Sequence, residues 1–493
     1  MCLFNTETRQ LETFSPLEPP RVRMYSCGPT VYDYAHVGNL RAYVFTDILK
    51  RTLEYNDYEV DHTINFTDFG HLSDDGDHGE DKIMKGLRRE GLPITLEAMR
   101  TLTDTYIKVF QEDIAALHIK PPTTWARASD YVTEQIALIQ SLYEKGHIYE
   151  TSDGWYFSIA TFPAYGRLGN IDLTKLRTGA RVDENLEKKH PADFAVWKKA
   201  SLGWDSPWGT GFPGWHIECS AMAQATLGEQ LDIHTGGIDH IHTHHNAEIA
   251  QSEAASGKPF ARYWLHNEFL TIDDEKISKS AGTNLTLHTL QERGISPLSL
   301  RYWLLTAHYR TTVNLSFNAL QAAQQSLERL QRHLYLELPE TTSQPDAEII
   351  QRCTAALNDD LDTPTVIALL WDTVRSTHLD DATKRSTILE IDTILDLNLS
   401  LTNTEGRAAL GIIPPEEIPD SLQSRLQTRE TARINRDWTI ADQIRDELLQ
   451  AGYILEDTAQ GPILRHINRP VQLNSSHRAT IAKPYDEHSI IDQ

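Results

Sequence analysis

The chain has 493 residues, of which 40% are hydrophobic and 24% charged, and its formal net charge is −24. This composition is typical of a soluble globular protein, and no apolar run approaches the roughly 20 residues that cross a bilayer. The acidic excess argues against a protein that coats nucleic acid nonspecifically, because phosphate binding needs clustered Lys and Arg, although local basic patches can still bind RNA.

The length predicts about three or four domains of roughly 100–200 residues each. Residues 1–10 have the pattern of neither a signal peptide nor a transit peptide, so we expect a cytoplasmic protein. The cysteines are too scattered for a disulfide framework in a chain of this size: Cys2, Cys27, Cys219 and Cys353. We expect at least some of them to be free thiols or metal ligands.

The first recognisable unit is a strand, a helix and a second strand. Residues 21–27 predict a strand that runs into the turn at 28–29. Residues 40–55 carry apolar side chains at helical spacing, and residues 60–66 follow as the second strand. This order predicts a parallel α/β sheet, whose ligands bind beyond the carboxyl ends of the strands.

The sheet is expected to be interrupted by an insertion. Residues from about 121 to 215 contain a hairpin signal at 152–154 and then a polar stretch rich in Lys, Pro and Gly. Residues 231–234 resume the strand pattern, and a helix from about 244 to 256 follows. The predicted fold class is therefore α/β, with a discontinuous parallel-sheet domain.

Helical patterns dominate from about residue 295 onward, which predicts a helix bundle for most of the C-terminal third. The expected helices are 298–305, 319–336, 347–357, 363–376 and 422–449. Beyond residue 465 the composition turns polar, and we expect a weakly ordered tail.

Residues 29–39, between the first strand and its helix, carry groups that suit phosphate. Gly38 permits close approach of a ligand, His36 and Asn39 offer donors, and a helix N-terminus follows. Taken alone, such a segment is more often a turn with an Asn cap.

A second segment of this kind lies at residues 274–283. Lys276 and Lys279 flank small residues on a Gly-containing loop and could neutralise charge on a departing pyrophosphate. A solvated loop is the simpler interpretation of either lysine alone. The occurrence of both segments, in this order around a split sheet, favours a nucleotide site.

The runs HVGN (36–39) and KISKS (276–280) resemble the HIGH and KMSKS signatures of class I aminoacyl-tRNA synthetases. The surrounding residues resemble, more narrowly, the cysteinyl-tRNA synthetase family. That similarity extends over about residues 1–466 and rests on CGPTVYD at 27–33, GWHIECSAM at 214–222, and DIH at 232–234 ahead of a Gly-Gly and a His-His pair.

The resemblance implies a Rossmann-like parallel-sheet catalytic domain split by an insertion and followed by an all-α C-terminal region. The implied domains are the catalytic domain at 1–120 and 216–260, a connective subdomain at 121–215, a stem-contact region with KISKS at 261–310, a helical bundle at 311–415, an anticodon-binding region at 416–466 and a flexible tail at 467–493.

The resemblance also implies one zinc ion per chain with four protein ligands: Cys27, Cys219, His244 and Glu248. Thiolate, imidazole and carboxylate all bind zinc, and the last two ligands are four residues apart on one predicted helix face. The residues alone do not choose among the crowded histidines 240, 242, 244 and 245. Four protein ligands usually form a closed site, so capture of a substrate thiolate implies that the coordination expands.

Cysteine itself is placed by the resemblance among five residues: Cys27, Thr67, Trp215, His234 and Asp239. Serine differs from cysteine only by oxygen for sulfur, and an apolar pocket separates such near-isosteres by about 1–3 kcal/mol. A soft thiolate bonded to metal separates them far more strongly, which implies selectivity without an editing site. Without the resemblance, Trp215 could equally be a core residue, and Thr67 reads more readily as a sheet residue.

ATP, accompanied by Mg²⁺, is implied to contact Thr30, His36, Gly38, Asn39, Gly237 and Lys279. The implied reaction joins the carboxylate of L-cysteine to the α-phosphate of ATP, releases pyrophosphate, and then transfers cysteine to the terminal ribose of tRNA(Cys). His36 and Asn39 would hold phosphate, and Lys276 and Lys279 would neutralise the leaving group. We expect a monomer with no membrane partner.

In the implied anticodon-binding region, cations alternate with an aromatic ring at Arg433, Arg436, Trp438 and Arg445. Such a mixture suits stacking on single-stranded bases. The alternative is an amphipathic surface helix with Trp438 in its core.

The chain departs from the commoner family pattern at Asn39, which replaces a final His, and at Asn246, which stands where an acidic residue is expected. The acidic, Gly-rich residues 71–80 have no assigned role. Two other functions stay open. A cysteine ligase of the mycothiol pathway shares the zinc and adenylation chemistry but generally lacks an end such as 420–466, and a noncatalytic RNA-binding paralogue need not retain the site residues that this chain has.

Overall fold

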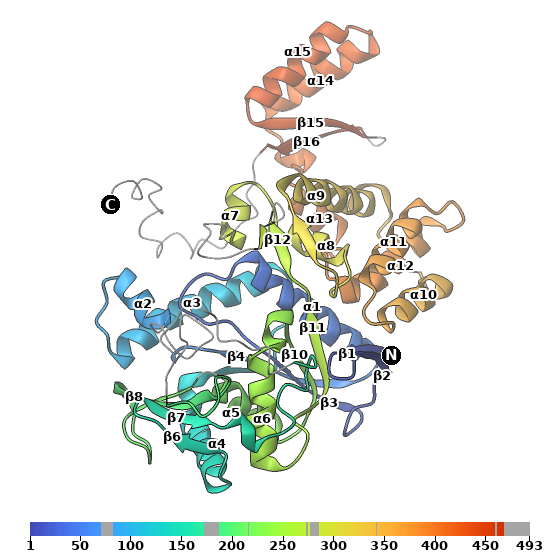
Figure 1. Ribbon diagram of the computed structural model, residues 1–493. Coiled ribbons are helices and arrows are strands. Elements are labelled where there is room, and N and C mark those ends of the chain that lie inside the picture. Colours follow the sequence, from blue (N-terminus) through green and yellow to red (C-terminus); the bar gives the residue numbers. More distant parts are fainter. Residues whose placement is uncertain are drawn as a thin grey trace.

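The computed structural model describes residues 1–70, 82–171, 187–214, 216–272, 275–276, 285–341, 343–458 and 461–467. A five-stranded sheet with the strand order β11–β10–β3–β4–β5 forms its centre (Figure 1). These strands are β3 (Arg21–Ser26), β4 (Glu59–Phe66), β5 (Thr124–Arg127), β10 (Leu231–Gly237) and β11 (Ala261–Asn267). Every pairing in the sheet is parallel, which confirms the predicted fold class.

The strand order of the sheet reverses between β3 and β10. From β3 the chain proceeds through β4 to β5 on one side, whereas β10 and β11 extend the sheet on the other side. Ligands of open α/β sheets bind at the carboxyl ends of the strands beside such a reversal. Cys27, directly after β3, and Gly237, the last residue of β10, both lie at this place. Strands β5 and β11 lie outside residues 1–120 and 216–260, so the sheet extends beyond the bounds that were expected for the catalytic domain.

Helix α1 (Val37–Tyr55) connects β3 to β4 and is buried along most of its length. Its apolar residues, such as Leu40 and Ile48, pack in the main core, and removing them from water favours folding. Its buried charges, Arg41 and Asp47, are hydrogen bonded to other segments of the chain. Helix α1 also contacts α8 (Pro297–Leu305) and α12 (Asp381–Leu395), so it joins the sheet to the helical region.

The insertion forms its own layer beside the sheet. Helix α4 (Val132–Glu144) precedes a four-stranded antiparallel sheet of order β6–β7–β8–β9. Its strands are β6 (Ile148–Glu150), β7 (Gly154–Phe157), β8 (Phe194–Trp204) and β9 (Gly211–Pro213). The predicted hairpin at 152–154 is confirmed, since it joins β6 to β7. Phe157 and Trp197 of this sheet share a core with residues of α5 (Ile217–Leu227) and α6 (His244–Ser256).

Smaller elements complete the part of the chain before residue 316. These are the hairpin β1 (Cys2–Asn5) and β2 (Gln10–Thr13), helices α2 (Lys82–Arg89) and α3 (Leu96–Ala116), and a sheet of β12 (Leu270–Ile272), β13 (Glu275–Lys276) and β14 (Val313–Leu315). No helix among the described residues has the length and apolar character to cross a membrane. The acidic residues 71–80 and the tail from 468 lie outside the described residues.

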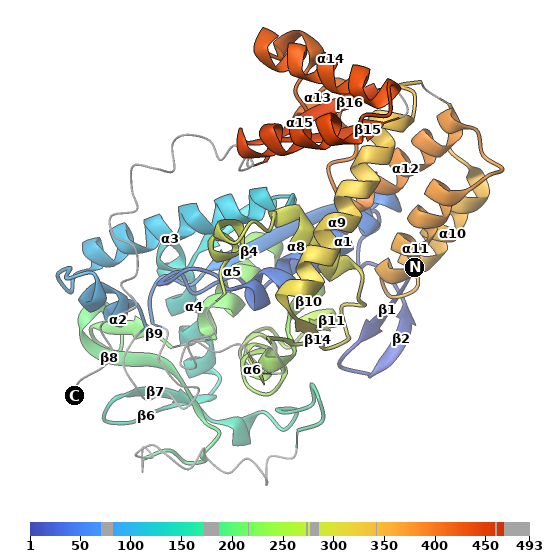
Figure 2. The same ribbon diagram turned by 90° about the horizontal axis from the view of Figure 1, so that it is seen from above.

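The C-terminal third is helical, as predicted, except for a hairpin at its end. The helices are α7 (Leu287–Glu292), α8, α9 (Phe317–Arg332), α10 (Ala347–Leu357), α11 (Thr363–Arg375), α12, α13 (Asn403–Ala409), α14 (Asp420–Ile434) and α15 (Trp438–Gln450). Strands β15 (Tyr453–Thr458) and β16 (Gly461–His466) form the hairpin. Figure 1 shows these last elements beyond α9 and α13, and in Figures 1 and 2 they lie away from the central sheet.

The expectation of one helix over 422–449 is wrong, because α14 ends at Ile434 and α15 begins at Trp438. Arg436 between them has a φ of 59°, a left-handed conformation that no continuous α-helix contains. The side chain of Asp437 then accepts a hydrogen bond from the backbone N–H of Ile440 and caps α15. The polar Asn-Arg-Asp run thus ends one helix and starts the next.

Candidate active site and metal centre

The four predicted metal ligands meet at the carboxyl edge of the central sheet. Cys27 follows β3, Cys219 lies in α5, and His244 and Glu248 lie one turn apart in α6. One ligand atom from each residue lies within 4.8 Å of the others. Nε2 of His244 is 2.8 Å from Oε1 of Glu248, and Sγ of Cys27 is 3.8 Å from the same oxygen. The fold thus gathers donors that are distant in sequence.

A second group of ligand atoms overlaps the first. Cys27, His234, His245 and Glu248 also offer atoms within 4.8 Å of one another. Nε2 of His234 is 2.7 Å from Oε2 of Glu248, and Nε2 of His245 is 3.3 Å from Sγ of Cys27. The two groups share Cys27 and Glu248, so Glu248 presents one carboxylate oxygen to each group.

The donors have the chemistry and the burial that a soft divalent cation requires. Cys219, His244 and Glu248 are at most 4% exposed, and a buried charge of this kind needs a partner. Burial opposes ionisation of Cys219, but its hydrogen bond with Cys27 lowers the pKa of the Cys219 thiol to about 6. Burial likewise opposes ionisation of Glu248, but His234 and His244 outweigh it and hold the pKa of that carboxyl well below its usual range. The site therefore fits zinc, which binds thiolate, imidazole and carboxylate together.

Neighbouring histidines orient the donor rings. Nδ1 of His244 lies 2.7 Å from Nδ1 of His216, so the other ring nitrogen, Nε2, faces Glu248. His216 has a φ of 83°, which is rare for a residue with a side chain. In the second group of ligand atoms, Nδ1 of His245 lies 2.8 Å from Nε2 of His266. Such contacts fix which nitrogen of a ring can bind a metal.

The residues predicted to surround cysteine are only partly brought together. Thr67 is buried one position after β4, and its hydroxyl donates a hydrogen bond to Oε1 of Glu218 over 2.7 Å. His234, in β10, points to Glu248 rather than to an open crevice. Asp239 is exposed in the short 3-10 helix Ile238–Ile241 that follows β10. Trp215 lies outside the described residues.

The HVGN segment caps helix α1. Nδ1 of His36 accepts a hydrogen bond from the backbone N–H of Asn39, and Oδ1 of Asn39 accepts one from the backbone N–H of His36. The segment is thus a capped turn, but His36 rather than Asn39 is the capping residue. Because Nδ1 of His36 is an acceptor, the neutral ring carries its proton on Nε2. Gly38 is the second residue of the helix, where backbone N–H groups favour an anion.

The chain that follows KISKS pairs with HVGN at residues 285 and 286. The backbone N–H of Val37 donates to the carbonyl of Leu285 over 2.9 Å, and His36 pairs with Thr286. On the other side, the backbone of Lys276 pairs with Thr271 in the β12–β13 ladder. The side chain of Lys276 and all of Lys279 lie outside the described residues. Of the remaining ATP residues, Thr30 pairs with Thr67 and Gly237 ends β10.

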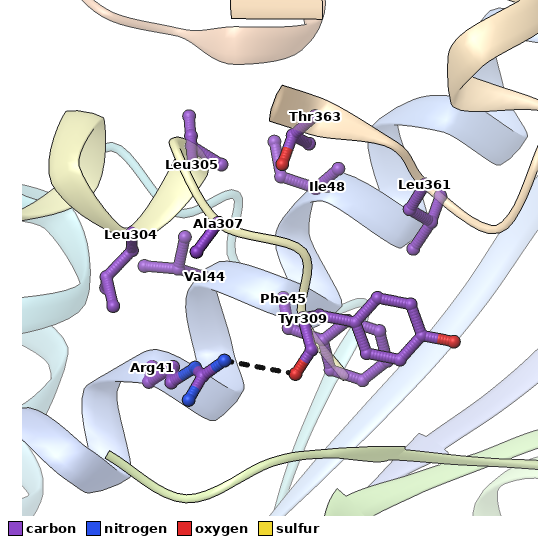
Figure 3. Close-up of a pocket in the computed structure, with 10 residues that line it drawn as sticks. All are labelled: Arg41, Val44, Phe45, Ile48, Leu304, Leu305, Ala307, Tyr309, Leu361 and Thr363. Atoms are coloured by element: carbon purple, nitrogen blue, oxygen red, sulfur yellow. Dashed lines mark hydrogen bonds between the residues drawn. The ribbon is translucent and has the colours of Figure 1, made fainter. Parts of the chain in front are cut away.

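A small cavity under α1 lies in the junction with the helical region (Figure 3). Its volume is about 30 Å³, and it is lined mainly by apolar side chains, among them Val44, Ile48 and Leu304. The guanidinium of Arg41 at its edge donates to the carbonyls of Phe269 and Tyr309. The volume suits no substrate, so this is a packing defect rather than a binding site.

Several residues of the site were not predicted from the sequence. They are Asn65, His216, Glu218, His245 and His266, all at most 6% exposed. His216 and Glu218 belong to the GWHIECSAM run, so that run carried a signal for them. His266 carried none, because only the pairing of β10 with β11 brings it beside α6.

The residues of the predicted anticodon-binding region are now placed as well. Trp438 is 58% exposed at the start of α15, and the neighbouring Ile434 is 82% exposed. The alternative in which Trp438 is a core residue is therefore wrong. Arg433 and Arg445 both pair with Asp457 of β15. These contacts hold two of the three predicted cations beside the hairpin.

Comparison with known proteins agrees with this geometry. Residues 13–325 match the family model described as the tRNA synthetases class I (C) catalytic domain. Methionyl-tRNA synthetase of Mycobacterium tuberculosis, solved in complex with methionyl-adenylate, superposes with a TM-score of 0.53 and 15% identity, over 80% of this chain and 95% of that one. Fold and site thus define a class I aminoacyl-tRNA synthetase.

Relatives of higher identity narrow the class. Cysteine–tRNA ligase 1 of Burkholderia lata is 45% identical over 468 residues, which cover 94% of this chain and 96% of that protein. Cysteine–tRNA ligase of Treponema denticola is 38% identical over 487 residues, covering 93% and 98%. The chain belongs to the cysteine–tRNA ligase family.

Proposed function

We propose that this chain activates L-cysteine with ATP to form cysteinyl adenylate and then transfers cysteine to the terminal ribose of tRNA(Cys). The observation that carries the proposal is the buried cluster of two thiols, an imidazole and a carboxylate at the strand-order reversal of the sheet. Its position beside the capped turn of HVGN suits a reaction between a thiol-bearing amino acid and a nucleotide.

Zinc is the proposed metal, held by Cys27, Cys219, His244 and Glu248. This group contains both thiols, whereas the overlapping group has only one, and zinc prefers thiolate ligands. When bound, the ion supplies a soft acceptor for the thiolate of cysteine, to which the hydroxyl of serine is a poor match. The chain's own residues orient the donors: His216 contacts His244, and His234 contacts Glu248.

For ATP, we propose that His36 donates from Nε2 to phosphate, at the N-terminus of α1. Asn39 fixes the ring of His36 through the capping box and leaves its own side-chain amide directed at that turn. Lys276 and Lys279 neutralise charge on departing pyrophosphate, with Mg²⁺ bridging the phosphates. Thr30, Gly38 and Gly237 supply backbone close to the nucleotide.

For tRNA, we propose that residues 311–415 support the body of the molecule and that residues 416–466 read the anticodon. The exposed ring of Trp438 supports this, because unpaired bases stack on exposed aromatic side chains. A mycothiol-type cysteine ligase generally lacks an end of this kind. We further propose that the protein is a monomer and that it acts in the cytoplasm, where tRNA is charged.

The test is cysteine-dependent exchange of pyrophosphate into ATP by the purified full chain, with and without tRNA. We expect exchange with cysteine, none with serine, and about one zinc per chain. Cys219→Ser should abolish exchange, whereas Cys353→Ser, at a buried position of helix α10 in the C-terminal region, should retain it and serves as the matched control. Exchange in wild type followed by transfer to an amino sugar instead of tRNA would favour the mycothiol pathway. No exchange would favour a noncatalytic paralogue.

A further inference from the structure

Arg41 is a buried cation whose hydrogen bonds go to backbone carbonyl groups. It lies in the second turn of α1, the helix that begins at the HVGN turn, and is 4% exposed. Nη1 donates to the carbonyl of Phe269 over 2.6 Å, and Nη2 donates to the carbonyls of Thr311 over 2.5 Å and Tyr309 over 3.1 Å. Figure 3 shows the bond to Tyr309. One guanidinium thus joins α1 to two other segments of the chain.

The setting of Arg41 is costly for a charged group. Burying a charge costs free energy, and a paired carboxylate is the usual compensation. Burial lowers the pKa of the Arg41 guanidinium to about 10, and Glu268 opposes this decrease only in part. The guanidinium stays charged at neutral pH, and the carbonyl dipoles stabilise it. Its planar fork carries donors on separate nitrogens, so it suits a connection between two segments.

The carbonyls that Arg41 binds stand at the starts of two parallel strands. Phe269 directly precedes β12, and Thr311 lies two residues before β14. The two strands pair from Leu270 and Val313 onward. The backbone N–H of Val313 also donates to the carbonyl of Phe269 over 3.3 Å. Arg41 therefore fastens the beginning of this small sheet to α1.

The same small sheet carries the backbone of Lys276. Strand β13 has two residues, and Lys276 pairs with Thr271 of β12. A strand this short has no stable position of its own, so β12 places it. After KISKS the chain returns to α1, where the backbone N–H of Val37 donates to the carbonyl of Leu285. Helix α1 thus holds the chain on both sides of KISKS, and Arg41 provides the connection on the N-terminal side.

We propose that Arg41 is a positioning residue for the departure of pyrophosphate, because it fixes the backbone of Lys276 relative to the HVGN turn through β12 and β13. The proposal rests on the proposed activation of cysteine, in which His36 holds phosphate and Lys276 neutralises the leaving group. Arg41 itself touches neither ATP nor cysteine. A displacement of about 1 Å at a reacting group can lower a rate a hundredfold, so such an anchor affects catalysis.

The experiment compares Arg41→Met, Lys276→Ala and their double variant by cysteine-dependent pyrophosphate exchange without tRNA. Arg41→Met should lower kcat about ten- to a hundredfold, with the KM for cysteine and the zinc content unchanged. Since Arg41 acts through Lys276, the loss on adding Arg41→Met to Lys276→Ala should be at least about fivefold smaller than the loss on adding it to wild type. Equal losses in the two backgrounds would overturn the proposal.

Arg385→Met is the matched control. Arg385 of α12 is also 4% exposed, and its guanidinium donates to the carbonyl of Leu334 over 3.0 Å. Its described hydrogen-bond partners lie in the helical bundle, at residues 334, 401 and 403. Arg385→Met should keep kcat of exchange within about twofold of wild type, even where its melting temperature falls. A decrease as large as in Arg41→Met would overturn the proposal in favour of general destabilisation.

A second readout separates the departure of pyrophosphate from the later step. Enzyme loaded with cysteinyl adenylate in the presence of pyrophosphatase is isolated and mixed with tRNA(Cys) for a single turnover. Pyrophosphate has already left this complex, so the rate of transfer by Arg41→Met should equal that of wild type. A decrease in transfer by the same factor as in exchange would overturn the proposal.

Arg41→Lys decides the outcome if melting temperature and zinc content show that Arg41→Met does not fold. Lysine keeps the charge but lacks the two-nitrogen fork that connects the carbonyls of Phe269 and Thr311. A lower kcat with an unchanged KM for cysteine and unchanged transfer supports the proposal, and an unchanged kcat overturns it. Absence of exchange by wild type would refute the proposed function instead.

Discussion

Arg301 of α8 donates a hydrogen bond to Asp47 of α1 over 2.5 Å, and both side chains are fully buried. The same guanidinium donates to the carbonyls of Leu395, at the end of α12, and Leu117, after α3. Asp47 is also paired with Arg51. This network joins the catalytic sheet to the helical region through groups that cannot reach water if a partner is lost.

Arg301→Met should therefore lower the free energy of unfolding by about 3–5 kcal/mol, the range for breaking a buried ion pair. Urea unfolding followed by tryptophan fluorescence measures the change. Arg375→Met is the matched control, because Arg375 pairs with Asp372 on the surface with 66% exposure, and it should cost less than about 1 kcal/mol. Similar losses for the two variants would show that the buried network has no special weight.

The group of ligand atoms that holds zinc determines which of two neighbouring histidines, His244 or His245, matters more for zinc affinity. If zinc is held by the group with both cysteines, His244→Asn should weaken zinc binding by more than about a hundredfold, because a direct ligand is lost. His245→Asn should weaken it by about ten- to a hundredfold at most, because His245 then contacts the ligand Cys27 but not the ion. Competition with a chromophoric chelator gives both affinities. The reverse order would assign the ion to the group with His234 and His245.

Gly28 admits no side chain. A Cβ atom there would lie 1.5 Å from the backbone oxygen of Asn65, so strand β4 or the turn after Cys27 would have to move. Gly28→Ala should lower both zinc content and cysteine-dependent exchange. Gly146→Ala is the control: a Cβ there meets nothing within 4 Å, and only the left-handed φ of 77° costs about 1–2 kcal/mol. Wild-type zinc content in Gly28→Ala would contradict the prediction.

Asp392 of α12 gives stability a pH dependence. Burial raises the pKa of its carboxyl to about 6, even though the backbone N–H groups of Leu397 and Leu399 donate to it. The folded state then holds the proton more tightly than the unfolded state, so this group's contribution to stability is fully present below the unfolded pKa of about 4, decreases as the pH rises through the folded pKa of about 6, and is lost above it. Between pH 5 and pH 7, wild type should lose about 1 kcal/mol of unfolding free energy relative to Asp392→Asn.

Paired urea titrations of wild type and Asp392→Asn at the two pH values measure that difference. The constant cost of the substitution cancels in the comparison, since only the titration of Asp392 distinguishes the two slopes. The prediction fails if the unfolding free energy of wild type relative to Asp392→Asn is the same at pH 5 and pH 7, or is higher at pH 7. Either result would show that the hydrogen bonds from Leu397 and Leu399 keep the carboxyl ionised.

Local patterns in the sequence were sufficient for elements whose signal is periodic. The helix at 244–256 and the hairpin at 152–154 were predicted closely, because apolar spacing and turn residues act over a few neighbours. The break at Arg436 was missed, since apolar spacing continues across it and only the backbone conformation interrupts the helix.

The sequence by itself determined the fold class, the two segments proposed to bind phosphate and the types of residue available for metal binding. The tertiary structure alone decided which donors meet. Cys27, Cys219 and His244 come together because β10 pairs with β3 and α5 and α6 pack at the end of that pair, and no local pattern encodes this pairing. The same holds for the bond between Thr67 and Glu218, which depends on the long-range packing of α5 against β4.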